Sequence, residues 1–247
     1  MMKVSQFART QGGASMLTNI SVIIPFQTDR GPRERIYHWV RKFYAQTMPE
    51  AELVLGFLDD KEINKSKAVN QAVKQATKDI LVLADADVVY DPNLIAKAIL
   101  YVDQAAMVIP FTEIRDMNQP GTERLLAADP VWPVEVKQEE NMKSPLMYEG
   151  FAGKLIVMHR KHFEAVGGFD ERFIGWGGED DAFSLSVRTI CGELVNLEGE
   201  IYHMWHPPST YRTNPHGKAN RELLKRYDQA NGNQEAMLKL IHERGTQ

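Results

Sequence analysis

Short apolar runs alternate with amphipathic segments along the first 110 residues of the chain. The apolar runs are rich in β-branched residues, have the length of buried strands and occupy residues 19–25, 52–58, 79–84 and 106–110. The amphipathic segments repeat their apolar positions every three or four residues, as helices do, and occupy residues 32–46, 64–77 and 92–103. Strands that alternate with helices in this way predict an α/β fold with a mostly parallel central sheet flanked by helices.

The pattern is less regular in the rest of the chain. Residues 111–150 are rich in proline and charge, and we expect long loops over one face of the sheet, with at most a short helix. Strands are then expected at residues 150–159, 193–197 and 200–203, and helices at 161–166, 179–192 and 220–244, the last as one helix or as two that break at 231–233. We expect a flexible leader at 1–18, a single domain at 19–247 and, within it, a helical tail at 211–247.

Composition and charge narrow the class of protein. Of the 247 residues, 43% are hydrophobic and 25% charged, as in ordinary globular proteins, so a mainly disordered chain is excluded. The net charge of -4 argues against non-specific binding of nucleic acid, because counterion release requires a surplus of positive charge. The single cysteine, Cys191, cannot form an internal disulfide, and no apolar stretch is long enough to predict a transmembrane segment.

An acidic motif, Asp85-Ala86-Asp87, follows the predicted strand at residues 79–84. Ligands of open α/β sheets bind beyond the carboxyl ends of the strands, which is where this motif falls. Two carboxylates at this spacing can approach one hard divalent cation such as Mg²⁺ or Mn²⁺, whose coordination is commonly completed by substrate phosphates. A solvated acidic turn is the alternative interpretation of so short a motif.

The segment from Asn64 to Asp87 resembles the nucleotide-sugar half of glycosyltransferases of the GT-A fold. The resemblance implies that Asp87 binds the metal ion directly and that Asp85 contacts the ribose or a metal-bound water. It also places Asn64 and Lys67 near the nucleotide, although both equally suit the exposed face of an amphipathic helix. Residues 19–110 are therefore expected to form the nucleotide-sugar-binding half of a GT-A domain.

A second polar cluster follows the first predicted strand. The same family has Pro-Phe-Arg at this point, whereas this chain has Pro25-Phe26-Gln27, so the first arginine is replaced. The resemblance implies that Arg30 or Arg33 takes over the contact with the nucleotide, and the alternative is that both simply flank the start of a helix. The donor-binding residues expected beside the acidic pair are Pro25, Phe26, Arg30, Asn64, Lys67 and Ala86.

A glycine-rich loop with one tryptophan leads into three consecutive acids. Glycines on both sides of Trp176 allow backbone conformations that other residues avoid, and a tryptophan on such a loop suits stacking on the apolar face of a sugar ring. The helix dipole also favours acids at a helix N-terminus, which would account for one or two of the three. The acids are Glu179, Asp180 and Asp181.

Residues 150–183 resemble the acceptor region of inverting enzymes of the β-1,4-galactosyltransferase and chondroitin-polymerase type, which share G-G-F followed by W-G-G-E-D-D. The resemblance implies that Asp180 is the catalytic base, that Asp181 holds acceptor hydroxyls, and that Trp176, Gly177 and Glu179 belong to the acceptor site. An Asp near its usual pKa of about 4 is ionised at neutral pH and can accept the hydroxyl proton. Residues 111–210 are expected to form this acceptor-binding half.

Two histidines, His203 and His206, lie at the end of a short predicted strand. A lone histidine is more often structural, but two at this spacing favour metal ligation in a chain that already has an acidic motif. The galactosyltransferase type completes its metal site with Met-x-x-His here, so the resemblance supports His206 and marks His203 as a departure. Together with Asp87 they form a mixed nitrogen and oxygen set, which suits Mn²⁺ better than Ca²⁺.

These motifs predict a metal-dependent inverting glycosyltransferase, with Mn²⁺ or Mg²⁺ as cofactor, that moves a sugar from a UDP-sugar to a hydroxyl of a carbohydrate or another acceptor. One alternative is a retaining transferase of the polypeptide N-acetylgalactosaminyltransferase type, which shares W-G-G-E but typically has Asn where this chain has Asp180. Others are a non-catalytic nucleotide-sugar- or carbohydrate-binding module on the same fold, and a nucleotidyltransferase, which would not explain the Trp176 loop. The single cysteine and the lack of a transmembrane segment predict a cytoplasmic protein of bacterial or viral origin.

Overall fold

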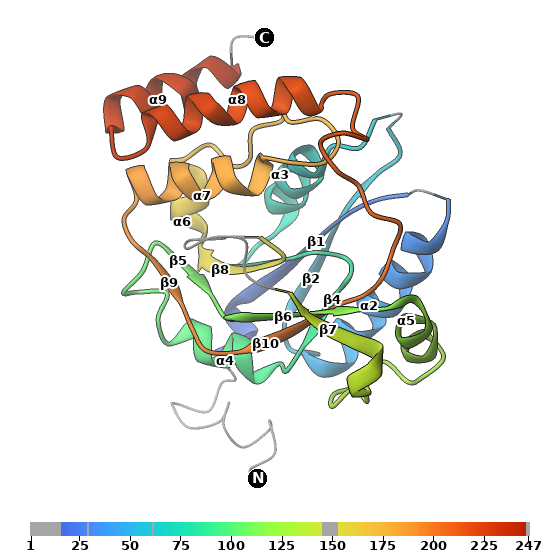
Figure 1. Cartoon of the computed structure of the whole chain (residues 1–247). Helices are drawn as coiled ribbons and strands as arrows, with labels where there is room; N and C mark the ends of the chain where they lie inside the picture. The colour runs from blue at the N-terminus through green and yellow to red at the C-terminus, as the bar shows by residue number, and fades with distance from the viewer. Residues whose placement is uncertain (1–15, 29, 61, 145–152, 246–247) are drawn as a thin grey trace.

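The predicted alternation of strands and helices forms the first half of the structure. The computed structural model describes residues 16–28, 30–60, 62–144 and 153–245. Its strands β1 (Ile20–Gln27), β2 (Glu52–Leu58) and β3 (Ile80–Ala84) pair in parallel, with β1 in the middle. The helices α2 (Pro32–Thr47) and α3 (Lys65–Gln75) connect them, and α4 (Asn93–Ile99) follows (Figure 1). This confirms the predicted α/β unit.

The main sheet is mixed rather than purely parallel. Its six strands run in the order β2-β1-β3-β8-β5-β9. Strand β8 (Leu155–His159) lies antiparallel to both β3 and β5 (Met107–Ile109), whereas β9 (Leu194–Asn196) is parallel to β5. The chain leaves the main sheet at the carboxyl end of β5 and re-enters it at that same edge, where Leu155 pairs with Ala84, so β8 runs against its neighbours. Residues 150–152 of the strand expected there lie outside the described residues.

A second sheet occupies part of the segment expected to be loops. It has the order β4-β10-β6-β7, formed by β4 (Val88–Tyr90), β10 (Glu200–His203), β6 (Glu113–Met117) and β7 (Asn141–Ser144). The helix α5 (Gln119–Leu126) and the 3-10 turn η2 (Gln138–Glu140) connect β6 to β7. The short helix α5 agrees with the expectation for this segment. The expectation of loops is wrong for β6 and β7, because a short strand with charged residues such as Arg115 and Asp116 lacks the apolar alternation that marks a strand.

The C-terminal helices form a separate layer at one end of the molecule (Figure 1). Helix α6 (Arg160–Ala165) follows β8, and α8 (Gly217–Ala230) and α9 (Gln234–His242) pack on α7 (Glu179–Ile190) around a small core that includes Phe173, Tyr227 and Met237. The tail is thus two helices, separated by a turn at Gly232, and ends in the turn η3 (Glu243–Gly245). In the described part of the chain, no helix combines the length and apolar character needed to span a bilayer.

Of the expected leader, residues 1–15 lie outside the described residues, and Met16–Asn19 form the short 3-10 helix η1.

A glycine of β2 sets the position of α3. Gly56 faces α3 so closely that a Cβ there would lie 2.3 Å from the carbonyl oxygen of Ala68. This close approach, which only glycine permits, sets the N-terminus of α3 beside the carboxyl ends of β1 and β2.

Candidate active site

The acidic motif lies where the two sheets meet. Strand β3 ends at Ala84, and the backbone N–H of Asp85 donates to the carbonyl oxygen of Lys154 at 2.8 Å, just before β8. The chain then turns into β4 of the second sheet, so Asp87 lies at the junction and is only 6% exposed. The strands on either side thereby hold both carboxylates at the carboxyl end of β3, as the sequence predicts.

Two histidines reach Asp87 from β10. His203 is the last residue of β10 and lies in register with Val88 of β4, which brings it next to Asp87. The His203 Nε2 atom is 3.6 Å from Asp87 Oδ1, and the His206 Nε2 atom is 3.2 Å from Asp87 Oδ2. The three residues form a group whose ligand atoms lie within 4.8 Å of one another, as metal ligands do.

The donor set fits a divalent cation of the Mn²⁺ type. Asp87 Oδ1 is buried and has no hydrogen-bond partner among the described residues, and a buried polar atom of that kind needs a ligand. In both histidines the Nδ1 atom faces an acceptor, Asp116 Oδ1 at 2.7 Å for His203 and the Pro207 carbonyl oxygen at 3.0 Å for His206. A neutral imidazole that donates from Nδ1 presents a lone pair at Nε2. The Nε2 atoms of both histidines and the Asp87 carboxylate can therefore all face one ion.

Charges and hydrogen bonds within this cluster shift the pKa values of Asp87, His206 and Asp116. Burial opposes ionisation of Asp87, but the charge of His203 and the hydrogen bond from His206 hold the pKa of Asp87 well below its usual range. Burial also opposes protonation of His206, yet the hydrogen bond and charge of Asp87 raise the pKa of His206. The His203 hydrogen bond is the largest of the effects that lower the pKa of Asp116 to about 2. The cluster thus attracts positive charge, which a metal ion would also supply.

The glycine loop places Trp176 and the three acids opposite this cluster. Gly177 has φ of 111°, and a Cβ there would come within 2.7 Å of the Tyr211 ring, so the loop can close on Tyr211 only with glycine. Trp176 is 42% exposed and meets Tyr211 edge to face, with 5.1 Å between ring centroids. Helix α7 begins at Glu179, whose Oε2 accepts the Gly177 backbone N–H at 3.0 Å.

Lys65 joins the two acidic groups. It is the first residue of α3, and its Nζ atom lies 2.8 Å from Asp85 Oδ1 and 2.9 Å from Asp180 Oδ1. Burial opposes the charge on Lys65, but Asp180 and Asp85 raise its pKa well above the usual value. The sequence analysis missed Lys65, although its position after the capping residue Asn64 and close to the strand ends is a signal that could have found it.

Burial shifts the pKa values of the acids at the start of α7. Burial raises the pKa of Asp180 above its usual value although Lys65 opposes the shift, so the expectation of an ordinary pKa is wrong. Burial and the Asp180 charge raise the pKa of Glu179 to about 7. Burial and the charge of Asp228 raise the pKa of Asp181. Desolvation of a carboxylate makes it a stronger proton acceptor, which is a property of a general base.

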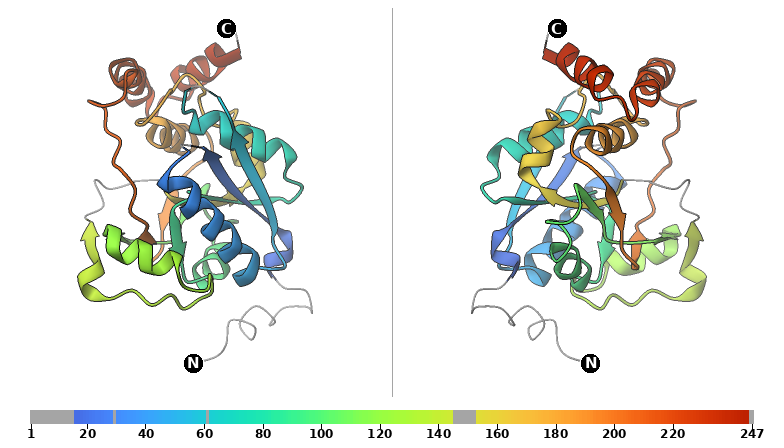
Figure 2. Two further views of the ribbon diagram at one scale, coloured as in Figure 1. Left: turned by 90° about the vertical axis from the view of Figure 1, so that its right-hand side faces the viewer. Right: turned by 90° about the vertical axis from the view of Figure 1, so that its left-hand side faces the viewer.

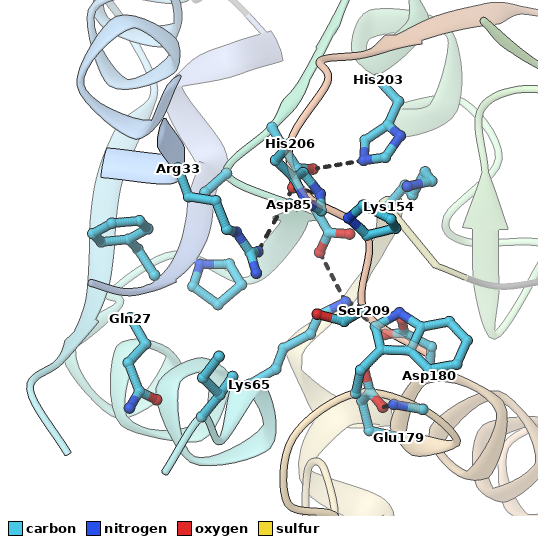
Figure 3. Close-up of a pocket in the computed structure, with 18 of the residues that line it drawn as sticks. Gln27, Arg33, Lys65, Asp85, Lys154, Glu179, Asp180, His203, His206 and Ser209 are labelled. Carbon is cyan, nitrogen blue, oxygen red and sulfur yellow. Dashed lines mark hydrogen bonds and ion pairs between the residues drawn. The ribbon is translucent and has the colours of Figure 1, made fainter. Parts of the chain in front are cut away.

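The histidine and Asp87 cluster, Lys65 and the three acids at the start of α7 line one cavity of about 440 Å³ (Figure 3). The end of β3, the two histidines and the start of α7 therefore meet in one cavity, although they are far apart along the chain. The predicted residues that line the cavity are Pro25, Phe26, Asp85, Ala86, Asp87, Trp176, Gly177, Glu179, Asp180, Asp181, His203 and His206.

Three of the expected donor-binding residues do not line this cavity. The Asn64 side chain caps α3 by accepting the Lys67 backbone N–H at 2.9 Å. Lys67 pairs instead with Asp60, 2.6 Å away, and Arg30 is exposed. Gln27 lines the cavity, but its amide also holds the loop before α3 by donating to the carbonyl oxygens of Asp60 and Glu62.

Other cavity residues carry charge or an aromatic ring. Arg33 lines the cavity, and its Nη2 atom lies 3.7 Å from Asp87 Oδ2. Of the two arginines considered for the nucleotide contact, Arg33 is therefore the one that reaches the cavity. The sequence analysis did not identify Lys154, Asp116 and Tyr211 as site residues. Lys154 has φ of 63°, an uncommon backbone conformation for a lysine, but nothing in a single sequence marks such a position.

The family of the chain follows from comparison with protein-family models. Residues 21–167, more than half of the chain, match the model described as glycosyl transferase family 2, so the chain belongs to that family. Residues 136–208, which include the second sheet's β7 and β10 and both histidines, match the model described as the N-terminal domain of galactosyltransferase. These matches confirm the resemblance to glycosyltransferases of the β-1,4-galactosyltransferase type.

Curated relatives have glycosyltransferase names. The β-N-acetyl-D-glucosaminide β-1,4-N-acetylglucosaminyl-transferase of Lymnaea stagnalis is 30% identical over 95 residues, which are 36% of this chain and 19% of that protein. Chondroitin sulfate N-acetylgalactosaminyltransferase 2 of Mus musculus is 23% identical over 176 residues, 66% of this chain and 32% of that protein. The chain thus spans about a third or less of the length of these relatives.

A solved structure shows the same fold. The crystal structure of GalNAc-T7 with UDP, GalNAc and Mn²⁺ aligns with a TM-score of 0.53 at 12% identity, covering 92% of this chain and 55% of that chain. This likeness confirms the predicted GT-A fold.

Proposed function

We propose that the chain is a metal-dependent inverting glycosyltransferase that moves a sugar from a UDP-sugar to an acceptor hydroxyl, with Asp180 as the general base. The observation that carries the proposal is the single cavity in which the Asp87, His203 and His206 cluster faces the acids at the start of α7 (Figure 3). A non-catalytic binding module would have no use for a desolvated carboxylate opposite a metal-ligand set. The family membership and the names of the relatives support the same activity.

The donor side of the cavity suits a nucleotide diphosphate. Asp87, His203 and His206 would hold Mn²⁺, and a bound ion supplies the charge that stabilises a leaving diphosphate. Arg33 and Lys154 line the same region and add positive charge for an anionic donor. The GT-A structure aligned above contains UDP, GalNAc and Mn²⁺, which favours UDP as the nucleotide here.

The acceptor side suits a sugar or another hydroxyl compound. Trp176 and Tyr211 form an aromatic corner at the cavity, against which the apolar face of a pyranose can pack. The acceptor oxygen attacks the anomeric carbon and its proton passes to the Asp180 carboxylate. As the new glycosidic bond forms, the bond to the diphosphate breaks, and UDP departs with that electron pair. A single displacement of this kind inverts the anomeric centre.

Metal-dependent release of UDP from a panel of UDP-sugars tests the proposal. We expect turnover with Mn²⁺ and an acceptor, and none with excess chelator. Asp180→Asn should bind the donor but lose transfer by at least about a hundredfold, the usual scale of general-base catalysis. The matched control is Asp103→Asn, which removes an exposed carboxylate that pairs with His159 far from the cavity. Turnover at the wild-type rate in Asp180→Asn would remove this residue from the role of base.

The stereochemistry of the product tests inversion separately. The coupling of the anomeric proton at the new glycosidic bond reports the configuration of the product in an NMR spectrum. We expect the configuration opposite to that of the donor. A retained configuration would leave the glycosyltransferase assignment intact and replace the inverting mechanism with the retaining one.

A further inference from the structure

Asp116 contacts one of the candidate metal ligands from the neighbouring strand. Strands β6 and β10 pair in parallel, and their register places Asp116 directly beside His203. The Asp116 Oδ1 atom is 2.7 Å from His203 Nδ1, and the Ser144 hydroxyl of β7 donates to Asp116 Oδ2. Three strands of the second sheet therefore hold one histidine of the cavity through a continuous set of hydrogen bonds.

The contact determines which nitrogen of His203 faces the cavity cluster. An ionised carboxylate can only accept hydrogen bonds, so Nδ1 carries the proton and donates it to Asp116. The lone pair of the neutral ring then lies at Nε2, the atom that is 3.6 Å from Asp87 Oδ1. His206 has the same arrangement with a weaker acceptor, since its Nδ1 faces the Pro207 carbonyl oxygen at 3.0 Å.

We propose that Asp116 is a positioning residue of the metal centre, which holds His203 in the Nδ1-protonated tautomer with Nε2 directed at the ion and thereby strengthens cation binding. The inference rests on the proposed function, because the Mn²⁺ ion that His203 would bind belongs to that proposal. A carboxylate behind a ligating imidazole fixes the orientation of the ring and increases the basicity of the ligand nitrogen, and its loss typically weakens metal binding 10- to 100-fold.

A double-mutant cycle separates this role from a general effect on the sheet. The dissociation constant of Mn²⁺ is measured by electron paramagnetic resonance on the full chain without donor, for wild type, Asp116→Ala, His203→Ala and the double variant. We expect Asp116→Ala alone to weaken binding roughly 10- to 100-fold. In the His203→Ala background the same change should alter binding by less than about twofold, because Asp116 acts through that imidazole.

Two further variants and an NMR measurement test the hydrogen bond between Asp116 and His203 directly. Asp116→Asn retains an oxygen acceptor for Nδ1 and should recover part of the affinity that Asp116→Ala loses. Glu200→Gln is the matched control, since it removes a carboxylate from β10 that pairs with Arg115 and does not line the cavity, and it should leave Mn²⁺ binding unchanged. The ¹⁵N shifts of the His203 ring should report a proton on Nδ1 in wild type and its redistribution in Asp116→Ala.

The outcomes distinguish this inference from the proposed function. An equal loss of affinity from Asp116→Ala in both backgrounds, or no loss in the single variant, overturns the role of Asp116 while metal-dependent transfer by wild type stands. If wild type does not bind Mn²⁺, the proposed metal site itself fails and the inference falls with it. If Asp116→Ala does not fold, the cycle is run with Asp116→Asn, and a wild-type spectrum with the His203 proton on Nε2 overturns the inference.

Discussion

Lys65 controls the charge on the proposed base, and its position makes that control testable. Its Nζ atom bridges Asp85 and Asp180, and its positive charge lowers the pKa of Asp180 against the effect of burial. Removing that charge leaves a buried carboxyl next to the Asp85 charge, and both of these raise the pKa of Asp180. The base would then be protonated over a wider range of acidic pH.

We therefore predict that Lys65→Met moves the acidic limb of the kcat/KM profile to higher pH. The base must be ionised to act, so the loss should be on the order of tenfold below neutral pH and smaller above it. The matched control is Lys67→Met on the same helix, because Lys67 pairs with Asp60 and does not line the cavity. Identical pH profiles for wild type and Lys65→Met would show that Lys65 does not act on the base.

Glu179 gives a prediction about stability rather than rate. Its pKa is raised from 4.5 to about 7, chiefly by burial, so the folded chain holds this proton more tightly than the unfolded chain. Between these two values the unfolded chain binds fewer protons, and the free energy of unfolding falls as the pH rises. Wild type should lose about 2 kcal/mol more between pH 5 and pH 8 than Glu179→Gln does.

Urea unfolding of both proteins in the presence of chelator, at several pH values, measures that difference. Glutamine keeps an oxygen that can accept the Gly177 N–H, so the variant removes the titrating group with little change in local contacts. Parallel stability profiles for the two proteins would contradict a raised pKa of Glu179.

At the scale of elements, the glycine loop and the segment after β10 form one unit. Tyr211 packs against Gly177 and Trp176, and Asn214 Nδ2 donates to the carbonyl oxygens of Ile174 and Trp176 at 2.8 and 2.9 Å. In Figure 2 the orange segment that follows β10 runs from the second sheet to the C-terminal helices. The packing of this segment against the loop therefore determines where the Trp176 ring lies.

We predict that Gly177→Ala disrupts the acceptor site, because its Cβ would meet the Tyr211 ring at 2.7 Å. Transfer to an acceptor should fall at least about tenfold, while slow hydrolysis of the donor, which needs no acceptor sugar, falls less. Gly192→Ala is the control, since Gly192 also has positive φ, 125°, but nothing lies within 4 Å of its added Cβ. Equal losses in the two variants would point to backbone strain alone.

The sequence predicts some elements better than others, for physical reasons. The buried strands β1 to β3 and the helices between them have clear apolar periods, and the predicted strand at 200–203 matches β10. The strands β6 and β7 of the second sheet are not predicted, because their apolar positions follow no regular period: in Glu113–Met117 only Ile114 and Met117 are apolar. For the site, motif spacing finds the acids and histidines, and the helix start after Asn64 is a signal for Lys65. Lys154 depends on tertiary placement that no local pattern records.

At the scale of the whole molecule, the candidate metal cluster joins the two sheets. Asp87 leads from β3 of the main sheet into β4, and His203 ends β10 of the second sheet. An ion held by both would connect segments that are far apart in the sequence, and such a site does not exist in the unfolded chain. Binding only to the folded state raises the free energy of unfolding by about 2.7 kcal/mol when the free ion is at a hundred times its dissociation constant.

We predict that saturating Mn²⁺ raises the midpoint of thermal unfolding by roughly 5–10 °C, since about 1 kcal/mol corresponds to 2–4 °C for a chain of this size. Ca²⁺ should raise it less, because imidazole nitrogens suit Mn²⁺ better. His206→Ala removes one ligand and should abolish most of the shift, whereas His38→Ala, an exposed histidine outside the cavity lining, should retain it. A full Mn²⁺ shift in His206→Ala would mean that the ion binds elsewhere, because loss of one of three protein ligands must weaken a site at the junction of the sheets.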